Sequence, residues 1–191
     1  MSNIYSIKVI STLFIMFLVS CSEPCVTFEN EIYTESNSNL NYELKQNFDV
    51  LFSALGESNI DSSAFETYRF FYGAYDDSLK VLLNVTNKND DYVLRKVVFT
   101  AKSLEQVTIY NDNKINLKAS DWDALQNDLY AHKYWTENNE GEVKGIRGAS
   151  LYIEGSRPQA KSCGKRIYHL IHKWNPKNDP LFKTYKVLLE K

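Results

Sequence analysis

The stretch from Gly145 to Pro176, GIRGASLYIEGSRPQAKSCGKRIYHLIHKWNP, decides the fold of this chain. Leu151-Tyr152-Ile153 consists of strand-forming residues, and Ile167–Trp174 alternates aromatic, branched and imidazole side chains. The segments between them, Ser156-Arg157-Pro158 and Ser162-Cys163-Gly164, have the composition of turns. The stretch therefore predicts one long β-hairpin.

Glu154 interrupts the apolar first strand, and its neighbours depend on the register of the hairpin. Because side chains alternate between the two faces, a shift of one residue moves every side chain to the other face. The favoured register groups the aliphatic side chains of both strands. It puts Glu154 on one face with Tyr168, Leu170, His172 and Trp174. In the register shifted by one residue, Glu154 lies opposite His169.

A carboxylate between apolar neighbours needs a partner, because burial without one raises its pKa. A His or a Tyr across the strand pair can supply that partner. Glu154 is then a structural residue that fixes the register, and the alternative is a Glu–His pair in a functional pocket. The candidate pocket consists of Glu154, Tyr168, His169, His172, Lys173 and Trp174.

The N-terminus has the pattern of a targeting segment. Lys8 provides a short positive region, and Val9–Val19 is an apolar run of signal-peptide length. The run closes with Leu18-Val19-Ser20-Cys21, which resembles the bacterial lipobox. The resemblance implies cleavage after residue 20 and acylation of Cys21, and two or more acyl chains anchor a protein stably. We therefore expect a bacterial cell-envelope lipoprotein. Ser22, the residue after the acylated Cys21, is not Asp, and in lipoproteins of enteric type that absence implies sorting to the outer membrane.

The expected mature chain has the charge balance of an ordinary single domain. Without residues 1–20 it carries 21 basic and 24 acidic residues, a net charge near −3. It has no basic tail or patch of the kind that nucleic acid requires, so nucleic acid is not an expected partner. We expect a polar tether over residues 21–39 and a single domain over residues 40–191.

Two cysteines remain after acylation of Cys21. The bacterial envelope outside the inner membrane is oxidising, so a Cys25–Cys163 disulfide is expected to join the N-terminal segment to the hairpin loop. Closing such a long loop stabilises a fold by roughly 2–5 kcal/mol. The Cys and His spacings do not match a structural zinc site, and neither a metal nor a cofactor is expected.

The rest of the chain predicts an α+β fold, with one antiparallel sheet and about three helices packed on it. Apolar residues recur at helical spacing over residues 40–55, and Gly56 ends that helix. Residues 65–110 read as a four-stranded meander, followed by a turn at Asn111-Asp112-Asn113. A second helix is expected to begin with Ser120 as its N-cap and to carry Tyr130 on its inner side near its C-terminal end. A third helix is expected to begin with Asp179 as its N-cap and Pro180 as its first residue.

About residues 119–191 resemble an uncharacterised bacterial protein group whose pattern is DG-x-x-W-x-x-E-G followed by YH-x-x-x-RW-x-P. The residues that carry the resemblance are Trp122, Leu125, Gly148, Leu151, Glu154, Gly155, Tyr168, His169, Lys173, Trp174 and Pro176. Arg147, Leu151 and Lys173 stand where the group has Asp, Trp and Arg. A lysine cannot make the planar two-pronged bond of an arginine to a carboxylate, which weakens a Glu154–basic pair carried over from the group. The group has no assigned reaction, so the resemblance supports the hairpin and the fold.

The sequence favours a binding function. It contains no Gly-x-Ser-x-Gly elbow, phosphate loop or dinucleotide fingerprint. The leading hypothesis is a lipid-anchored envelope protein that binds a protein partner without catalysis. One alternative is a hydrolase or cell-wall-acting enzyme that uses Glu154 with His169 or His172 as an acid–base pair. The other is a carbohydrate-binding module that uses Tyr68, Tyr72 or Tyr75.

Overall fold

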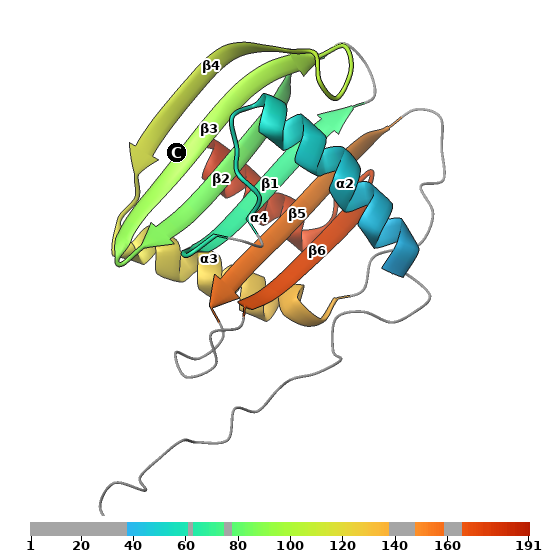
Figure 1. Cartoon of the computed structure of the whole chain (residues 1–191). Coiled ribbons are helices and arrows are strands. Elements are labelled where there is room, and N and C mark those ends of the chain that lie inside the picture. Colours follow the sequence, from blue (N-terminus) through green and yellow to red (C-terminus); the bar gives the residue numbers. More distant parts are fainter. Residues whose placement is uncertain (1–37, 61–62, 75–77, 138–147, 159–165) are drawn as a thin grey trace, which may run out of the picture.

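The computed structural model describes residues 38–60, 63–74, 78–137, 148–158 and 166–191 (Figure 1). The expected signal peptide, the acylated Cys21, most of the tether and the Cys25–Cys163 disulfide lie outside these residues. These four features therefore stay predictions. None of the helices in the described ranges is long and apolar enough to cross a membrane.

A six-stranded antiparallel sheet forms the centre of the fold. Its strands are β1 (Glu66–Ala74), β2 (Lys80–Lys88), β3 (Asp91–Ala101), β4 (Val107–Asn116), β5 (Ala149–Pro158) and β6 (Arg166–Trp174), and they lie in the order β4-β3-β2-β1-β5-β6. The first four strands form a meander. The chain then crosses the sheet, so that β5 pairs with β1 and the aromatic-rich β1 becomes central.

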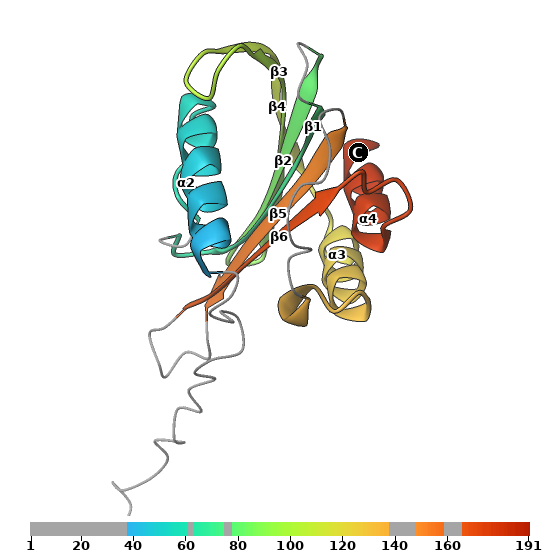
Figure 2. The same cartoon turned by 90° about the vertical axis from the view of Figure 1, so that its right-hand side faces the viewer.

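Helices cover both faces of the sheet, which confirms the predicted α+β architecture. The helix α2 (Ser38–Ala54) lies on one face, and α3 (Ala119–Ala131) and α4 (Pro180–Leu189) lie on the other (Figure 2). A short 3-10 helix, η1 (Tyr134–Thr136), follows α3. The side chains of adjacent strand residues point to opposite faces of the sheet. Phe71 therefore packs under α2, whereas Phe70 packs under α3 and α4.

The end of α2 positions a charged residue over the sheet. Gly56, at a φ of 75°, donates its backbone N–H to the Ser53 carbonyl at 2.9 Å. The Glu57 backbone N–H donates to the Phe52 carbonyl at 2.9 Å, and the two bonds together are a Schellman motif. The predicted glycine stop is confirmed. Because the motif fixes the direction of the next residue, it brings Glu57 back over the strands.

The register of the β5–β6 hairpin is the favoured one of the two predicted registers. Ile153 pairs with Ile171, and Glu154 pairs with Leu170. The prediction that Ser156-Arg157-Pro158 is part of a turn is wrong, because β5 continues through Pro158. Ser156 has a strand partner on each side, in β1 and in β6, and this double pairing overrides its turn composition.

The predicted turn at Asn111-Asp112-Asn113 is also wrong. These residues lie inside β4, where Asp112 pairs with Val97 and Asn113 pairs with Lys96 of β3. A bulge at Val98/Phe99 adjusts the pairing nearby. Since β4 is an edge strand that is exposed along almost its whole length, polar side chains cost little on either of its faces.

The α3 helix starts earlier than the sequence suggested. Its N-cap is Lys118 rather than Ser120, and the Asp121 carboxylate accepts the Lys118 backbone N–H at 3.1 Å. Its inner face consists of the buried residues Trp122, Leu125 and Leu129. The prediction that Tyr130 thickens this face is wrong, because its side chain is 84% exposed.

The α4 helix begins as predicted. The Asp179 carboxylate accepts the Leu181 backbone N–H at 2.8 Å, and Pro180 is the first helical residue. The inner face of the helix consists of buried residues that pack against the sheet: Leu181, Phe182, Thr184, Tyr185 and Leu188.

Candidate binding site

Glu154 lies fully buried in the middle of the α2 face, and its partner is an arginine. Arg69 is its neighbour across the β1–β5 pair, and the Arg69 Nη1 bonds the Glu154 Oε1. The Tyr168 hydroxyl donates to the Glu154 Oε2 at 2.9 Å, and the Tyr152 hydroxyl lies 3.4 Å from the same oxygen. Arg69 itself is 1% exposed, so both charges of the pair are removed from water.

The surroundings of Glu154 have opposing effects on its protonation. Burial raises the pKa of the Glu154 carboxyl, whereas the positive charge of Arg69 and the hydrogen bond from Tyr168 lower it. Burial also raises the pKa of Tyr152 and Tyr168, and the nearby Glu154 adds to both shifts. Both phenols therefore stay protonated and can act as hydrogen-bond donors.

The Glu154–Arg69 pair is one end of a chain of charges across the sheet. Arg69 Nη2 donates to the Ser58 carbonyl at 2.8 Å and lies 3.4 Å from the Glu57 carboxylate. The other Glu57 oxygen accepts from Arg95 Nη1 at 2.6 Å. Arg95 also holds Asp112 with two bonds, at 2.8 and 2.7 Å. We call these five residues, Glu154, Arg69, Glu57, Arg95 and Asp112, the charge ladder.

The charge ladder contains three acidic and two basic side chains, and each arginine lies between two carboxylates. Hydrogen bonding to Arg95 holds the pKa of Asp112 below its ordinary value. Hydrogen bonding to Asp112, opposed by burial and assisted by Glu57, raises the pKa of Arg95. The Asn84 amide nitrogen donates to Glu57 and ties β2 into the ladder. Together with Asn84, the ladder joins the α2–β1 connection to five strands of the sheet, β1 to β5.

The two predicted histidines separate onto different faces of β6. His169 lies on the α3–α4 side, where its ring packs edge-on against Tyr134 with a centroid separation of 5.0 Å. The Tyr134 hydroxyl donates to the His169 carbonyl at 2.8 Å. Burial lowers the pKa of His169 to about 4, so its imidazole is neutral at pH 7. His169 and Glu154 therefore do not form a pair.

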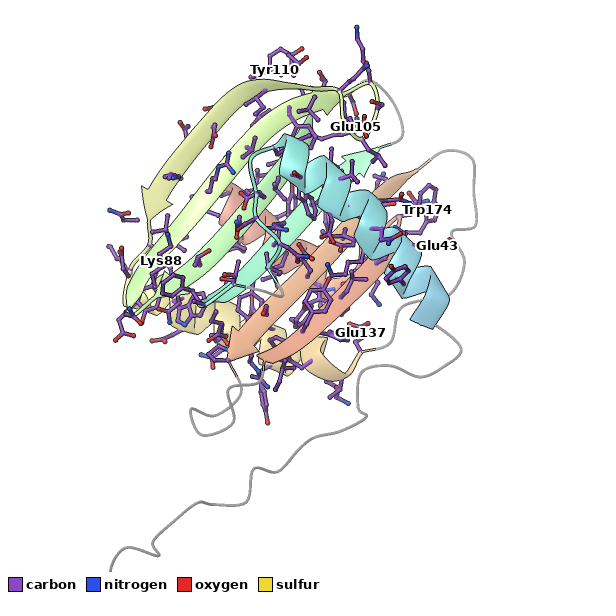
Figure 3. All side chains as sticks on the ribbon, viewed as in Figure 1. Glu43, Lys88, Glu105, Tyr110, Glu137 and Trp174 are labelled. Carbon is purple, nitrogen blue, oxygen red and sulfur yellow. The ribbon has the colours of Figure 1, made fainter. Side chains whose placement is uncertain are left out.

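The remaining predicted pocket residues also divide between the faces. Lys173 is 4% exposed on the side of His169, where its Nζ bonds Glu137 and lies 3.7 Å from Asp179. His172 is on the Glu154 face, two strand positions beyond Leu170, and lines an apolar cavity. Trp174 is at the far end of β6 (Figure 3). Of the six predicted residues, the structure brings Glu154 and Tyr168 into direct contact.

A polar cavity of about 670 Å³ opens beside the charge ladder, between the α2–β1 connection and strands β1 to β4. Its charged lining residues are Glu57, Arg69, Lys88, Arg95, Asp112 and Lys114. Lys88 marks one end of this cavity, at the β2–β3 turn (Figure 3). Two of its lining residues, Arg69 and Asn84, each have a buried atom, Nε and Oδ1, that makes no hydrogen bond within the described residues.

Sequence reasoning missed Arg69, Glu57 and Arg95. Arg69 sits in the aromatic segment Tyr68–Tyr72, and Arg95 sits among the apolar residues of β3. The rule that singled out Glu154, a charge inside an apolar strand, applies equally to both arginines. Glu57 carries no comparable signal, because its position depends on the motif that ends α2.

Comparison with known proteins adds no assignment: no protein family matches the chain, and no curated protein is significantly similar to it. Within the described ranges, no three His, Cys, Asp or Glu side chains gather in a group that could hold a metal ion. The function is therefore inferred from the geometry of the α2 face.

Proposed function

We propose that the protein is a lipid-anchored component of the bacterial cell envelope that acts by binding a protein partner. The anchor is Cys21, as the lipobox-like Leu18-Val19-Ser20-Cys21 implies. The binding surface is the polar cavity on the α2 face together with its charged rim. The partner presents an acidic segment to this rim.

The surroundings of Glu154 argue for binding over acid–base catalysis. A general acid or base must lie within hydrogen-bonding reach of a substrate. Glu154 is fully buried, and both of its oxygens are engaged by Arg69 and Tyr168. His169, the nearer candidate for a partner base in sequence, lies on the other face of the sheet. The enzyme alternative with a Glu154–His169 pair therefore has no supporting geometry. The alternative with His172, which shares the face of Glu154, is not favoured because both Glu154 oxygens are already engaged.

The tyrosines proposed for carbohydrate stacking are also engaged in packing. Tyr68 of β1 is fully buried and packs against Trp122, and its hydroxyl donates to the Glu66 carboxylate at 2.7 Å. Tyr72 is half-buried against Phe182 of α4, at a centroid separation of 4.8 Å. Tyr75 lies outside the described residues. Sugar stacking needs exposed ring faces, so these residues do not favour that function.

The observation that carries the proposal is the polar cavity with its charged lining. Two of its lining residues, Arg69 and Asn84, each have a buried polar atom with no hydrogen bond among the described residues, although such atoms are nearly always bonded in native proteins. The acidic lining residues Glu57 and Asp112 are both bonded to Arg95, whereas Lys88 and Lys114 are exposed at the rim. This arrangement gives the rim a positive surplus and selects an acidic partner.

The test is site-specific photo-crosslinking of the full chain in intact cells of its own bacterium. A photoreactive amino acid replaces Lys114 in one variant and Lys183 in the control. Lys183 is an exposed residue of α4, on the opposite face of the sheet. We expect a single stoichiometric protein adduct from position 114 and none from position 183.

Charge reversal then tests the chemistry of the partner. We expect Lys88→Glu and Lys114→Glu together to reduce capture of that partner by about tenfold, which corresponds to roughly 1.4 kcal/mol. Lys183→Glu should leave capture unchanged. Equal adducts from positions 114 and 183, or no stoichiometric adduct from either, would overturn the proposed function.

A further inference from the structure

A second cavity, of about 470 Å³, lies on the same face at the other side of α2. It is a half-open cavity that is bordered by α2, by the ends of the central strands and by the β3–β4 hairpin. Its apolar walls come from Leu44, Phe48, Leu51, Phe71, Ala101 and Leu104. Both the volume and the largely apolar lining are typical of sites that bury a small molecule, which span about 300–1,000 Å³.

The polar groups of this apolar cavity are basic or neutral. Lys80, Lys102 and His172 line it, and no carboxylate belongs to its lining among the described residues. Lys80 Nζ also donates to the Ser78 carbonyl at 3.2 Å, whereas the Lys102 side chain is exposed at the mouth. The Ser150 hydroxyl is buried at the cavity and makes no hydrogen bond within the described residues.

This combination matches an amphiphile with one apolar chain and an anionic head. The apolar walls remove a hydrocarbon chain from water. The Ser150 hydroxyl can donate to a carboxylate, and the Lys102 ammonium complements its charge. A two-chain lipid is a poorer fit, because a cavity of about 470 Å³ accommodates one long chain and leaves the second chain in water.

We propose that the apolar cavity binds a free long-chain fatty acid, with the chain between α2 and the sheet and the carboxylate at the basic mouth. The inference rests on the proposed function only in that the chain works by binding at a membrane, where such amphiphiles partition. It concerns a different cavity from the one assigned to the protein partner. A fatty acid in this cavity contacts α2 directly and therefore stabilises the packing of α2 on the sheet.

The experiment uses the purified full chain reconstituted in phosphatidylcholine liposomes. The probe is palmitic acid that carries a diazirine in the middle of its chain. After irradiation, peptide mass spectrometry locates the adducts. We expect them on the α2 segment Leu44–Leu51 and on the hairpin segment Ala101–Leu104, and we expect an excess of unmodified palmitate to suppress them.

Matched variants separate the cavity from the general surface. Asn47 is exposed on α2 and lines the cavity, so Asn47→Trp blocks it from outside the core. Val50, three residues further along α2 and 41% exposed, does not line the cavity, so Val50→Trp is the control. We expect the blocking variant to lower labelling by at least about tenfold. The free-energy cost of inserting a bulky side chain into a filled site is at least that of a tenfold change in affinity. The control should label as the natural chain does.

A second pair of variants tests the head group. Lys102→Glu should lower labelling by the carboxylate probe by about tenfold, because it replaces an attraction with a repulsion. It should leave labelling by the corresponding methyl ester unchanged, since the ester carries no charge. Lys183→Glu, on the opposite face, serves as the control and should change neither.

Three results would overturn the inference. The first is adducts that map outside the cavity lining, and the second is equal labelling of Asn47→Trp and Val50→Trp. The third is cavity adducts from a diazirine carried on a phospholipid chain of the same liposomes, which would assign the cavity to phospholipid. Capture of a protein partner from position 114 is unaffected by each of these results, so the two proposals fail independently.

Discussion

The two faces of the β5–β6 hairpin differ in how they accommodate a buried titratable side chain. On the α2 face, the carboxyl group of Glu154 is buried beside an arginine and two tyrosines. On the α3–α4 face, the imidazole of His169 is buried beside the rings of Tyr134 and Trp135. The first group is stabilised by an opposite charge, whereas the second is kept neutral by burial.

The comparison shows that a titratable residue in an apolar strand need not be catalytic. The chain offers Glu154 and His169 within one hairpin, yet the alternation of side chains sends them to opposite faces. Each then acquires neighbours from elements far away in the sequence. Those neighbours decide whether burial of the group stabilises or destabilises the fold as the pH changes.

The largest expected effect comes from removing the charge that compensates Glu154. Arg69→Met leaves a buried carboxylate without its cation, so we expect the free energy of unfolding to fall by about 3–5 kcal/mol. The double variant Arg69→Met with Glu154→Leu removes both charges and should recover most of that loss. Urea unfolding of the full chain, followed by tryptophan fluorescence, measures both.

The exposed pair Lys191–Asp121 is the control for that experiment. Its N–O distance is 2.7 Å, but the Lys191 side chain is 40% exposed, so Lys191→Met should leave the unfolding midpoint unchanged. The double variant could instead prove as unstable as Arg69→Met alone. The loss of stability would then come from the packing of Arg69 and its bond to the Ser58 carbonyl, and not from charge compensation.

The next effect is the pH dependence of the His169 face. The pKa of His169 is about 4 in the folded protein, against 6.5 for an ordinary histidine. As the pH falls through this window, the unfolded chain takes up a proton that the folded chain does not, so stability is lost. The shift predicts a loss of about 3 kcal/mol across the window, because each pKa unit corresponds to 1.36 kcal/mol.

His169→Gln removes this proton uptake, so we expect the variant to lose less stability than the natural chain when unfolding is measured at pH 7 and at pH 4. Asp112, whose pKa is lowered by Arg95, also destabilises the fold in acid, but it does so equally in both proteins. Equal acid-induced losses in the two proteins would show that His169 titrates normally. Titration of its ring protons by NMR measures the pKa directly.

The smallest effect compares one tyrosine hydroxyl on each face. Tyr168→Phe removes a hydrogen bond to the charged Glu154, and we expect a loss of about 2 kcal/mol. Tyr134→Phe removes a bond to the neutral His169 carbonyl, and we expect a loss of about 1 kcal/mol. Thermal unfolding of both variants checks the order. A larger loss for Tyr134→Phe would mean that Glu154 is not ionised in the folded protein.

Local patterns in the sequence predicted most of the secondary structure. The stop at Gly56, the β2–β3 turn and the Asp179 cap follow from backbone preferences and short-range bonds. The errors fall where long-range pairing overrides local composition. Asn111-Asp112-Asn113 is rich in turn formers, yet the ladder with β3 keeps it extended. Ser156-Arg157-Pro158 stays in a strand for the same reason.

The candidate site was predicted only in part. Glu154 was recognised as an unusual buried charge, and a tyrosine partner across the strand was among the expected solutions. Its arginine was not, because Arg69 is 85 residues away in the sequence and reaches Glu154 through the pairing of β1 with β5. Glu57 joins the charge ladder because the end of α2 turns the chain back over the sheet.

The sequence by itself determined the α+β class, the positions of the main strands and helices, and the presence of titratable residues such as Glu154 and His169 within the apolar hairpin. These features depend on side-chain periodicity and on capping within a few residues. Only the tertiary structure decided which groups meet. Strand order and the Schellman motif assemble the charge ladder from separate segments, and helices on both faces bury Glu154 and His169 apart. The physical reason is that electrostatic partnership and burial depend on distance in space, which local patterns do not encode.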